Sequence, residues 1–352
     1  MKFIKLMFLS IIFLTLSTVA SAQVVTWKIA ETWPKDFPLF GDAVKKMIQN
    51  VDTLSGGKFQ IISETKEVHN KALNVLQLVR DDEYEMGHTA SYYYKGLDIN
   101  TLFFTTLPMG MTSTEQLAWF YHGGGINLMK KTYAKHGILA FPGGNTGNQM
   151  GGWFKREIKT LDDLKGLKMR IPGLAGDVMK TLGVEVTNIP PGELYAALES
   201  GQLDALEWVG PSMDLNMGFH QVASFYYTGW HEPGTELAFF VNQKAFEELP
   251  KGFQDILTIS MRLASYDTYI QAQHMSATNL KQLLAEFPHI TIRSFPPTIY
   301  RRLIRETNKQ LDELAANGND LTREILSSIR EYQEKTRLWT RFSDQAYINN
   351  AF

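Results

Sequence analysis

Residues 24–63 read VVTWKIAETWPKDFPLFGDAVKKMIQNVDTLSGGKFQIIS, and this stretch decides the fold. Its beginning alternates apolar and polar side chains as a strand does, and Trp33-Pro34 ends that run. A helix is expected over about 39–54, and a second strand over 58–63 follows the turn Ser55-Gly56-Gly57. Because strands that alternate with helices are typical of a parallel sheet covered by helices, the stretch predicts an α/β fold.

The same alternation continues along the chain as far as Pro250. Further helices are expected over 74–81 and 192–200, and further strands over 85–89, 137–141, 167–171 and 204–208. Beyond Pro250 the pattern predicts a helix over 253–284, a short strand over 290–293 and mostly helix over 298–332. The expected architecture is an α/β body with a helical carboxyl-terminal third.

The chain is long enough for two domains. Its 352 residues exceed the size at which one hydrophobic core stops growing, and 44% of them are hydrophobic. Fixed-period repeats, low-complexity tracts and a linker of distinctive composition are absent from the sequence. We therefore expect the chain to cross between two lobes more than once.

Residues 1–22 have the pattern of a secretory signal peptide. Lys2 and Lys5 precede an apolar run over 6–16, and the small residues 20–22 provide a cleavage site. The run is too short, and too often interrupted by serine and threonine, to favour a membrane anchor. We expect a soluble mature protein in a Gram-negative periplasm, stabilised by burial alone because the sequence has no cysteine.

Charge and motif content argue against several functions. With 35 basic and 37 acidic residues, the chain has no global electrostatic reason to bind nucleic acid. The run 121–125 is similar to the oxyanion loop of lipases, but the sequence lacks their G-x-S-x-G nucleophile motif. The glycine-rich run 143–147 lacks the Gly-Lys-Ser/Thr that completes a phosphate-binding loop. The histidines do not pair at zinc-site spacing, so we expect surface or hydrogen-bonded roles for them, among them His88, His122, His220 and His231.

A set of motifs in the middle of the chain is more specific. They follow one another as NQMGGWF (148–154), DLKGLKMRIPG (163–173), GELYAALESGQLDA (192–205) and EWVGP (207–211). The set resembles the solute-binding subunits of tripartite ATP-independent periplasmic (TRAP) transporters, the DctP-type family. The similarity extends over nearly the whole mature chain.

The resemblance implies a two-lobe periplasmic binding protein fold with mixed sheets, hinge crossings and a helical carboxyl-terminal region. We expect lobe I to comprise residues 23–145 and about 234–275. Lobe II is expected to comprise residues 146–233 and about 276–352, which include the carboxyl-terminal helices.

The resemblance also implies a ligand and a cation. Within the family, the chain is most similar to the branch that binds 2-oxo or 2-hydroxy monocarboxylates such as pyruvate or lactate. By that similarity, Arg170 grips the ligand carboxylate. A cation is held by Gln149, Glu207 and the main-chain carbonyl of Trp208. The other implied ligand contacts, besides Gln149 and the Trp208 ring, are Asn148, Tyr93 and Tyr94.

The chemistry of these residue types fits the implied roles. A guanidinium is a planar fork that matches a carboxylate with two parallel hydrogen bonds. A carboxylate, an amide oxygen and a carbonyl oxygen form a hard ligand set that suits Na⁺ or Ca²⁺ rather than zinc. From the residues alone, Arg170 could equally form an ordinary salt bridge to Glu207 or Asp204, and Trp153 could line either the cleft or the core.

The implied function is that of a receptor and not of an enzyme. Such a receptor closes around a small organic carboxylate and presents it to the membrane subunits of a TRAP transporter. One alternative is a periplasmic enzyme that uses Glu207 as acid or base, although no nucleophile or cofactor motif can be assigned beside it. A ligand sensor for a signalling receptor would use the same pocket. Residues 287–352 are apolar enough to allow a homodimer, and packing on their own lobe accounts for them equally.

Overall fold

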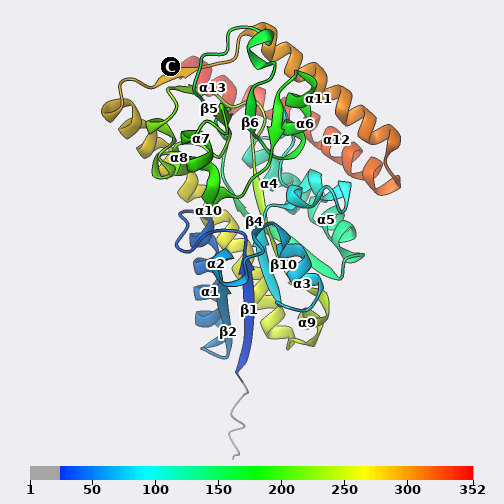
Figure 1. The fold of residues 1–352 in the computed structure, drawn as a ribbon. Helices are drawn as coiled ribbons and strands as arrows, with labels where there is room; N and C mark the ends of the chain where they lie inside the picture. The colour runs from blue at the N-terminus through cyan, green and yellow to red at the C-terminus, as the bar shows by residue number, and fades with distance from the viewer. Residues whose placement is uncertain (1–23, 352) are drawn as a thin grey trace, which may run out of the picture.

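The computed structural model describes residues 24–351, so the predicted signal peptide lies outside the described residues. The described chain forms two mixed β-sheets, each packed against helices (Figure 1). In Figure 1 one sheet lies below the other, and we call the parts built on them the lower half and the upper half. The predicted combination of mixed sheets with a helical carboxyl-terminal region is present.

The lower sheet has the strand order β2-β1-β3-β10-β4. Strands β1, β2 and β3 run parallel, whereas β10 is antiparallel to both β3 and β4. The strand bounds are β1 Val25–Glu31, β2 Phe59–Glu64, β3 Met86–Thr89, β4 Ile138–Asn145 and β10 Glu236–Asn242. The first part of the chain therefore supplies a parallel core, and a segment from much later in the sequence completes the sheet.

Both faces of the lower sheet are buried. Neighbouring strand residues point to opposite faces, and each face packs into a hydrophobic core. Ile29 and Phe239 pack towards α1 and α10, whereas Ala30 and Phe240 join the core on the other side. A strand covered on both faces consists of apolar residues throughout, as β10 does between Leu237 and Val241.

The upper sheet has the order β11-β9-β5-β8-β6-β7. Its central strands are short, and β8 runs parallel to β6 but antiparallel to β5. The strand bounds are β5 Gly152–Phe154, β6 Lys168–Arg170, β7 Glu185–Thr187, β8 Ala205–Leu206, β9 Phe225–Tyr227 and β11 Thr291–Arg293. The carboxyl ends of β6 and β8 therefore meet at one edge.

The α-helices surround both sheets (Figure 1). Their bounds are α1 Phe40–Ser55, α2 Lys66–His69, α3 Val75–Arg80, α4 Ser113–His122, α5 Gly125–Ala134, α6 Gly173–Thr181, α7 Leu194–Glu199, α8 Pro211–Met217, α9 Gln243–Glu248, α10 Lys251–Glu286, α11 Pro297–Asn317, α12 Asp320–Phe342 and α13 Asp344–Ala351. Short 3₁₀ helices include η2 Ser91–Tyr94 and η3 Ile99–Phe104. The elements predicted as far as Pro250 lie within a few residues of these bounds, whereas α12 continues beyond the predicted helical range of 298–332 and α13 follows it.

The carboxyl-terminal helical region differs from the expected continuous pattern at one point. Gly318 and Asn319 separate α11 from α12. The Asn319 side chain accepts a hydrogen bond from the Thr322 backbone N–H, which caps the start of α12. Helix α12 then packs against α4, α5 and η3.

The chain passes between the halves at more than one place. Residues 146–151 link β4 to β5, and residues 228–235 link β9 to β10. Helix α10 makes a further crossing, because it contacts α1 and β4 in the lower half and α8 in the upper half. The lobe limits given above stay a prediction.

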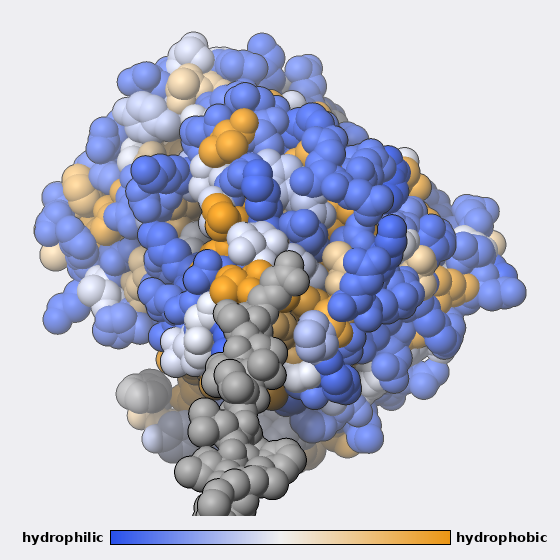
Figure 2. Space-filling model, turned by 90° about the horizontal axis from the view of Figure 1, so that it is seen from below, coloured by the Kyte–Doolittle hydropathy of each residue, from blue (hydrophilic) through white to orange (hydrophobic). Residues whose placement is uncertain are grey.

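The surface is mostly polar. Figure 2 views the molecule from below, where hydrophilic side chains cover most of the face. Among residues 24–351, no helix combines the length and apolar character needed to cross a membrane.

Candidate functional site

Arg170 ends β6 at the edge where the parallel strands β6 and β8 terminate. Its side chain is 1% exposed. One guanidinium nitrogen, Nη1, donates to the Glu207 main-chain oxygen at 2.6 Å and lies 3.3 Å from the Glu207 carboxylate. The alternative of a salt bridge to Glu207 is therefore present, whereas the Asp204 carboxylate accepts from the Lys168 backbone instead. The pair does not occupy the whole guanidinium, since Arg170 Nε is buried without a hydrogen-bond partner within residues 24–351.

The register of the sheet explains why these residues meet. Parallel strands β6 and β8 place Arg170 opposite Leu206, so the next residue, Glu207, emerges beside the guanidinium. The Glu207 backbone N–H donates to the Arg170 carbonyl at 2.9 Å. Two motifs separated in the sequence thus form one edge of the site.

Trp208 lies between the two halves. Its ring centroid is 5.2 Å from the guanidinium carbon of Arg170, a cation–π arrangement. On the lower side it contacts the rings of Phe37 and Phe40, with centroids 6.0 and 6.2 Å away. The indole therefore packs against the lower half, and a contact of its ring with the ligand stays a prediction. Trp153, by contrast, is a core residue that stacks on Tyr226.

Gln149 approaches from the crossing between β4 and β5. Its side-chain nitrogen donates to the Thr146 hydroxyl at 2.8 Å, which fixes the orientation of the amide. Its amide oxygen, like Glu207 Oε1, is buried without a hydrogen-bond partner among the described residues. Such orphaned buried oxygens are costly unless something else satisfies them. Oxygen ligands for a hard cation have this character, so the residues present fit Na⁺ or Ca²⁺.

His231 and Glu232 are the site residues that sequence reasoning missed. Together with Glu207 they form a buried group whose possible ligand atoms lie within 4.8 Å of one another. His231 is neither a surface residue nor a hydrogen-bonded one, because both ring nitrogens are buried without such a partner among residues 24–351. The spacing of His231 from the other histidines does not match a metal-site motif. Only its position in residues 228–235, which link the two halves, could have indicated that it lies in the site.

Burial dominates the electrostatics of this group. It raises the pKa of Glu207 to about 8 and that of Glu232 to about 7, with the Arg170 charge opposing both shifts. It lowers the pKa of His231 to about 4, so the imidazole is neutral and its 3.3 Å contact with Glu207 is not an ion pair. The site therefore holds more buried acidic groups than cationic ones, and a bound cation would favour ionised carboxylates.

The three remaining predicted ligand residues are placed differently. Tyr93 lies beside Arg170, and burial raises the pKa of its hydroxyl while Arg170 opposes the rise. Tyr94 points elsewhere, because its hydroxyl contacts Thr89 and accepts from the Leu76 backbone. Asn148 is exposed at the rim of the crossing. The structure thus brings Tyr93 to the arginine but neither Tyr94 nor Asn148.

Comparison with known proteins identifies the family. Residues 29–317 match the family described as bacterial extracellular solute-binding protein, family 7, also called DctP. The chain belongs to this family. The predicted resemblance to TRAP solute-binding proteins is confirmed.

Two solved structures of TRAP periplasmic solute-binding proteins are similar to this family member over its length. The protein from Colwellia psychrerythraea, with bound calcium and pyruvate, is 54% identical, with a TM-score of 0.92 and coverage of 93% of this chain and 100% of its own. The protein from Pseudoalteromonas atlantica T6c, with bound sodium and pyruvate, is 54% identical, with a TM-score of 0.91 and coverage of 93% and 99%. The predicted two-lobe fold is therefore confirmed.

A curated relative is also similar. It is the monocarboxylate 2-oxoacid-binding periplasmic protein of a Nostoc species, which is 36% identical over 341 residues, with coverage of 96% of this chain and 92% of the relative. The curated relative is named for 2-oxoacids, and the two solved structures contain pyruvate, which is a 2-oxoacid.

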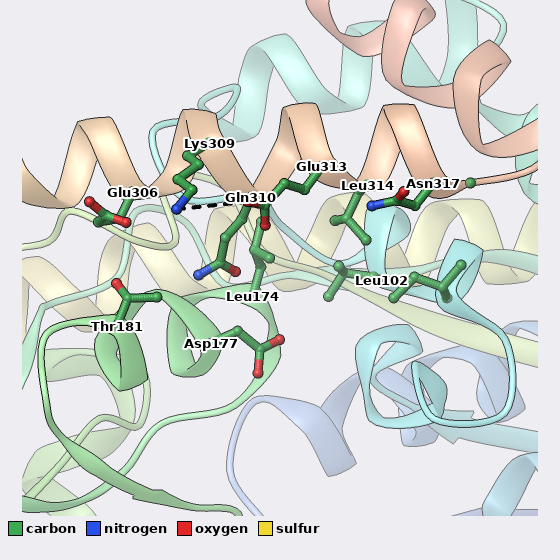
Figure 3. Close-up of a pocket in the computed structure, with 12 residues that line it drawn as sticks. Leu102, Leu174, Asp177, Thr181, Glu306, Lys309, Gln310, Glu313, Leu314 and Asn317 are labelled. Atoms are coloured by element: carbon green, nitrogen blue, oxygen red, sulfur yellow. Dashed lines mark ion pairs between the residues drawn. The ribbon is translucent and has the colours of Figure 1, made fainter.

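The halves of this solute-binding protein also touch away from Arg170. Lys95, just after η2, donates to the Gly173 carbonyl at 3.0 Å and pairs with Asp177 of α6. Asp177 also lines a cavity of about 490 Å³ between α6, α11 and η3 (Figure 3). Figure 3 shows Leu174 and Asp177 facing the row of polar side chains on α11. The residues that line this cavity do not include Arg170, Glu207 or Trp208.

Proposed function

We propose that this protein is the periplasmic receptor of a TRAP-type transporter. In this proposal it binds a 2-oxo or 2-hydroxy monocarboxylate, such as pyruvate or lactate, together with Na⁺ or Ca²⁺ between two closing lobes. Membrane subunits of the transporter then receive the ligand from the closed form.

The observation that carries the proposal is a buried arginine beside two orphaned oxygens. Arg170 keeps one nitrogen free for an anion, while the Gln149 amide oxygen and one Glu207 oxygen lack donors within the described residues. An acid anion would accept from the Arg170 guanidinium, and a cation would bind the Gln149 and Glu207 oxygens. Together they would satisfy all three groups and leave no buried charge without a partner. The pyruvate and metal bound in the Colwellia and Pseudoalteromonas relatives support this pairing.

The proposed roles rest on the resemblance to the family, and the burial of Arg170, Glu207 and Gln149 supports them. Arg170 would bind the ligand carboxylate, and the Trp208 ring would cover it. Gln149, Glu207 and the Trp208 carbonyl would hold the cation, whose charge draws the ligand oxygens towards the protein. The position of Tyr93 beside Arg170 supports a ligand contact for it, and the ligand roles of Tyr93, Asn148 and Tyr94 all stay predictions from the family.

Thermal unfolding and calorimetry test the proposal. Potassium pyruvate and potassium lactate are added to the mature protein with calcium, with sodium, or with neither. A ligand that binds the folded state alone raises the melting temperature, by an amount that grows with its concentration over its Kd. A cation-dependent rise with either acid supports the proposal, and the lack of any rise under all conditions would contradict it.

Export is part of the same proposal. The sequence pattern of residues 1–22 supports removal of a signal peptide, and the family description is of an extracellular protein. Amino-terminal sequencing of protein from a periplasmic extract is expected to begin at Gln23. An uncleaved chain that stays with the membrane would contradict this part.

A homodimer is proposed for the carboxyl-terminal surface. Large apolar side chains are exposed there on α12 and α13, namely Leu338, Trp339, Phe342, Tyr347 and Ile348. Exposed apolar groups of this size mark interaction sites more often than free surface. Light scattering is expected to give twice the chain mass, and Trp339→Glu with Phe342→Glu to give the monomer. A wild-type monomer at high concentration would rule the dimer out.

We also propose that the protein does not transform its ligand. Incubation with pyruvate or lactate, followed by product analysis, is expected to return the acid unchanged. Any turnover would favour the enzyme alternative, in which Glu207 acts as acid or base.

A further inference from the structure

The segment Glu207–Gly210 links every part of the proposed site. It carries the Glu207 carboxylate and the Trp208 ring and carbonyl. The Val209 carbonyl accepts from the Met150 backbone at 2.9 Å, directly beside Gln149. Small shifts of this segment would therefore move all three proposed cation ligands relative to one another.

The segment has no regular structure of its own to hold it. Strand β8 ends at Leu206, and α8 begins only at Pro211. Backbone hydrogen bonds hold the Glu207 N–H and the Val209 carbonyl, whereas the Val209 and Gly210 N–H groups are held by a side chain.

Asp214, on α8, provides that fixation. One of its carboxylate oxygens, Oδ1, accepts from the Gly210 N–H at 2.9 Å and from the Val209 N–H at 3.2 Å. The other, Oδ2, accepts from Trp153 Nε1 at 2.9 Å and from the Tyr226 hydroxyl at 2.8 Å. The side chain is 1% exposed, so these four donors form its surroundings.

The two donor pairs come from different parts of the molecule. Trp153 and Tyr226 lie on β5 and β9, and their rings stack with centroids 4.0 Å apart in the core of the upper half. Asp214 thus joins a stacked aromatic pair to the irregular segment between β8 and α8. A carboxylate suits this position because both of its oxygens accept, whereas an amide offers only one acceptor.

We propose that Asp214 is the positioning residue of the cation site, which holds Glu207 and the Trp208 carbonyl at the spacing that the ion requires. This inference rests on the proposed function, since it assigns the support of that same site. Asp214 is not one of the residues proposed to hold the ligand or the ion, because its two carboxylate oxygens accept from Val209, Gly210, Trp153 and Tyr226. Partners of this kind commonly affect metal affinity by roughly 10- to 100-fold when they are removed.

Asp214→Asn is the direct test. The amide oxygen can still accept from Val209 and Gly210, but the new NH₂ group then faces Trp153 Nε1, donor against donor. Calorimetric titration with calcium chloride, in sodium-free buffer with saturating potassium pyruvate, is expected to show calcium affinity lowered by roughly 10-fold or more.

A second substitution separates positioning from general damage. Trp153→Phe removes the opposing donor, so Asp214→Asn combined with Trp153→Phe is expected to recover calcium affinity relative to Asp214→Asn alone. Trp153→Phe by itself is the control for lost packing in the core. A role limited to stability would make the double variant the weakest of the three, and that order of affinities would overturn the proposal.

Hydrogen exchange gives a readout that needs no ligand. In the protein without added acid or calcium, Asp214→Asn is expected to speed exchange in the peptide that contains Val209 and Gly210, and Trp153→Phe to restore it in the double variant. Unchanged exchange there would also overturn the proposal. If wild-type protein binds neither calcium nor pyruvate, the proposed function fails, while the exchange result still decides whether Asp214 fixes the segment.

Discussion

Arg170 and Lys168 share strand β6, but only the arginine is buried at the site. Arg170→Lys keeps the charge and loses the two-pronged geometry. A hydrogen bond to a charged group contributes roughly 1.5–3 kcal/mol, so the loss of one is expected to weaken pyruvate binding by about tenfold or more. Calorimetry measures the effect.

Lys168→Ala is the matched control for this substitution, because its side chain is exposed on the same strand. It is expected to leave pyruvate affinity unchanged. Wild-type affinity in Arg170→Lys would show that the guanidinium fork does not hold the acid.

His88 illustrates a buried histidine with a structural role. Its Nδ1 accepts from Trp33 Nε1 at 2.7 Å, and its Nε2–H donates to the Gly143 carbonyl at 2.9 Å. Burial lowers the pKa of His88 to about 4. The unfolded chain therefore takes up a proton near pH 6.5 that the folded chain refuses, so the contribution of His88 to stability is expected to fall between about pH 6.5 and pH 4. The raised pKa values of Glu207 and Glu232 act in the opposite direction, so the His88 contribution is the difference between the wild type and a His88 variant.

Chemical unfolding at a series of pH values measures this loss. For His88 alone it amounts to on the order of 3 kcal/mol at the acid end. His88→Gln is expected to remove this one contribution from the pH dependence, whereas His122→Gln, at an exposed histidine, leaves the pH dependence as it was. Equal slopes in the wild type and His88→Gln would contradict the assignment.

Individual site residues could be predicted from the sequence where they belong to specific motifs. Arg170, Glu207 and Trp208 lie in contact in the structure, and their roles and that of Gln149 in binding stay predictions. His231 and Glu232 were not expected, because they lie in a crossing whose place in space depends on two sheets at once. Sequence spacing does not report contacts of that kind.

The break between α11 and α12 shows what element-scale patterns miss. Apolar residues continue at helical spacing on both sides of Gly318 and Asn319, so the sequence predicts mostly helix throughout. Packing decides the outcome, since a Cβ on Gly318 would approach the Thr322 side chain and the Leu314 carbonyl to 2.5 and 2.6 Å. The close approach of the two helices is therefore possible only with glycine.

The cap at this break is testable. Asn319→Ala removes the side chain that accepts from the Thr322 N–H, and is expected to lower the free energy of unfolding by about 1 kcal/mol. Denaturant titration measures it. Asn308→Ala, at an exposed position inside α11, serves as the control and should not destabilise the protein. An Asn319→Ala variant as stable as the wild type would show that the cap contributes nothing.

For the whole molecule, the contact of Lys95 with α6 joins the two halves. If closure accompanies binding, this contact favours the closed state and hence ligand affinity. Lys95→Ala is expected to weaken pyruvate binding by roughly two- to fivefold, because exposed ion pairs contribute up to about 1 kcal/mol.

Lys180 provides the comparison, since it also approaches Asp177, at 3.4 Å, but lies on the same helix. Lys180→Ala is expected to leave pyruvate affinity unchanged. Equal affinities in the Lys95 and Lys180 variants would show that the contact between halves does not contribute.

The fold class and the helical carboxyl-terminal region could be predicted from periodicity and from the motifs. The assembly of the sheets could not be predicted from periodicity alone. Strand β10 enters the lower sheet between β3 and β4, although much of the upper half separates it from them along the chain. Such long-range pairing depends on which surfaces fit, and a local pattern contains no information about it.

Helix α10 is one uninterrupted element of 36 residues, roughly 54 Å long, with no proline within it. It rests on α1 and β4 at one end, and at the other Asn279 donates to the Pro211 carbonyl. Because one continuous helix packs on both halves, we expect the halves to rotate relative to each other without separating along its length. The distance between spin labels at the two ends of α10 should therefore be the same with and without pyruvate. The distance between a label on the lower half and a label on the upper half should change when pyruvate binds.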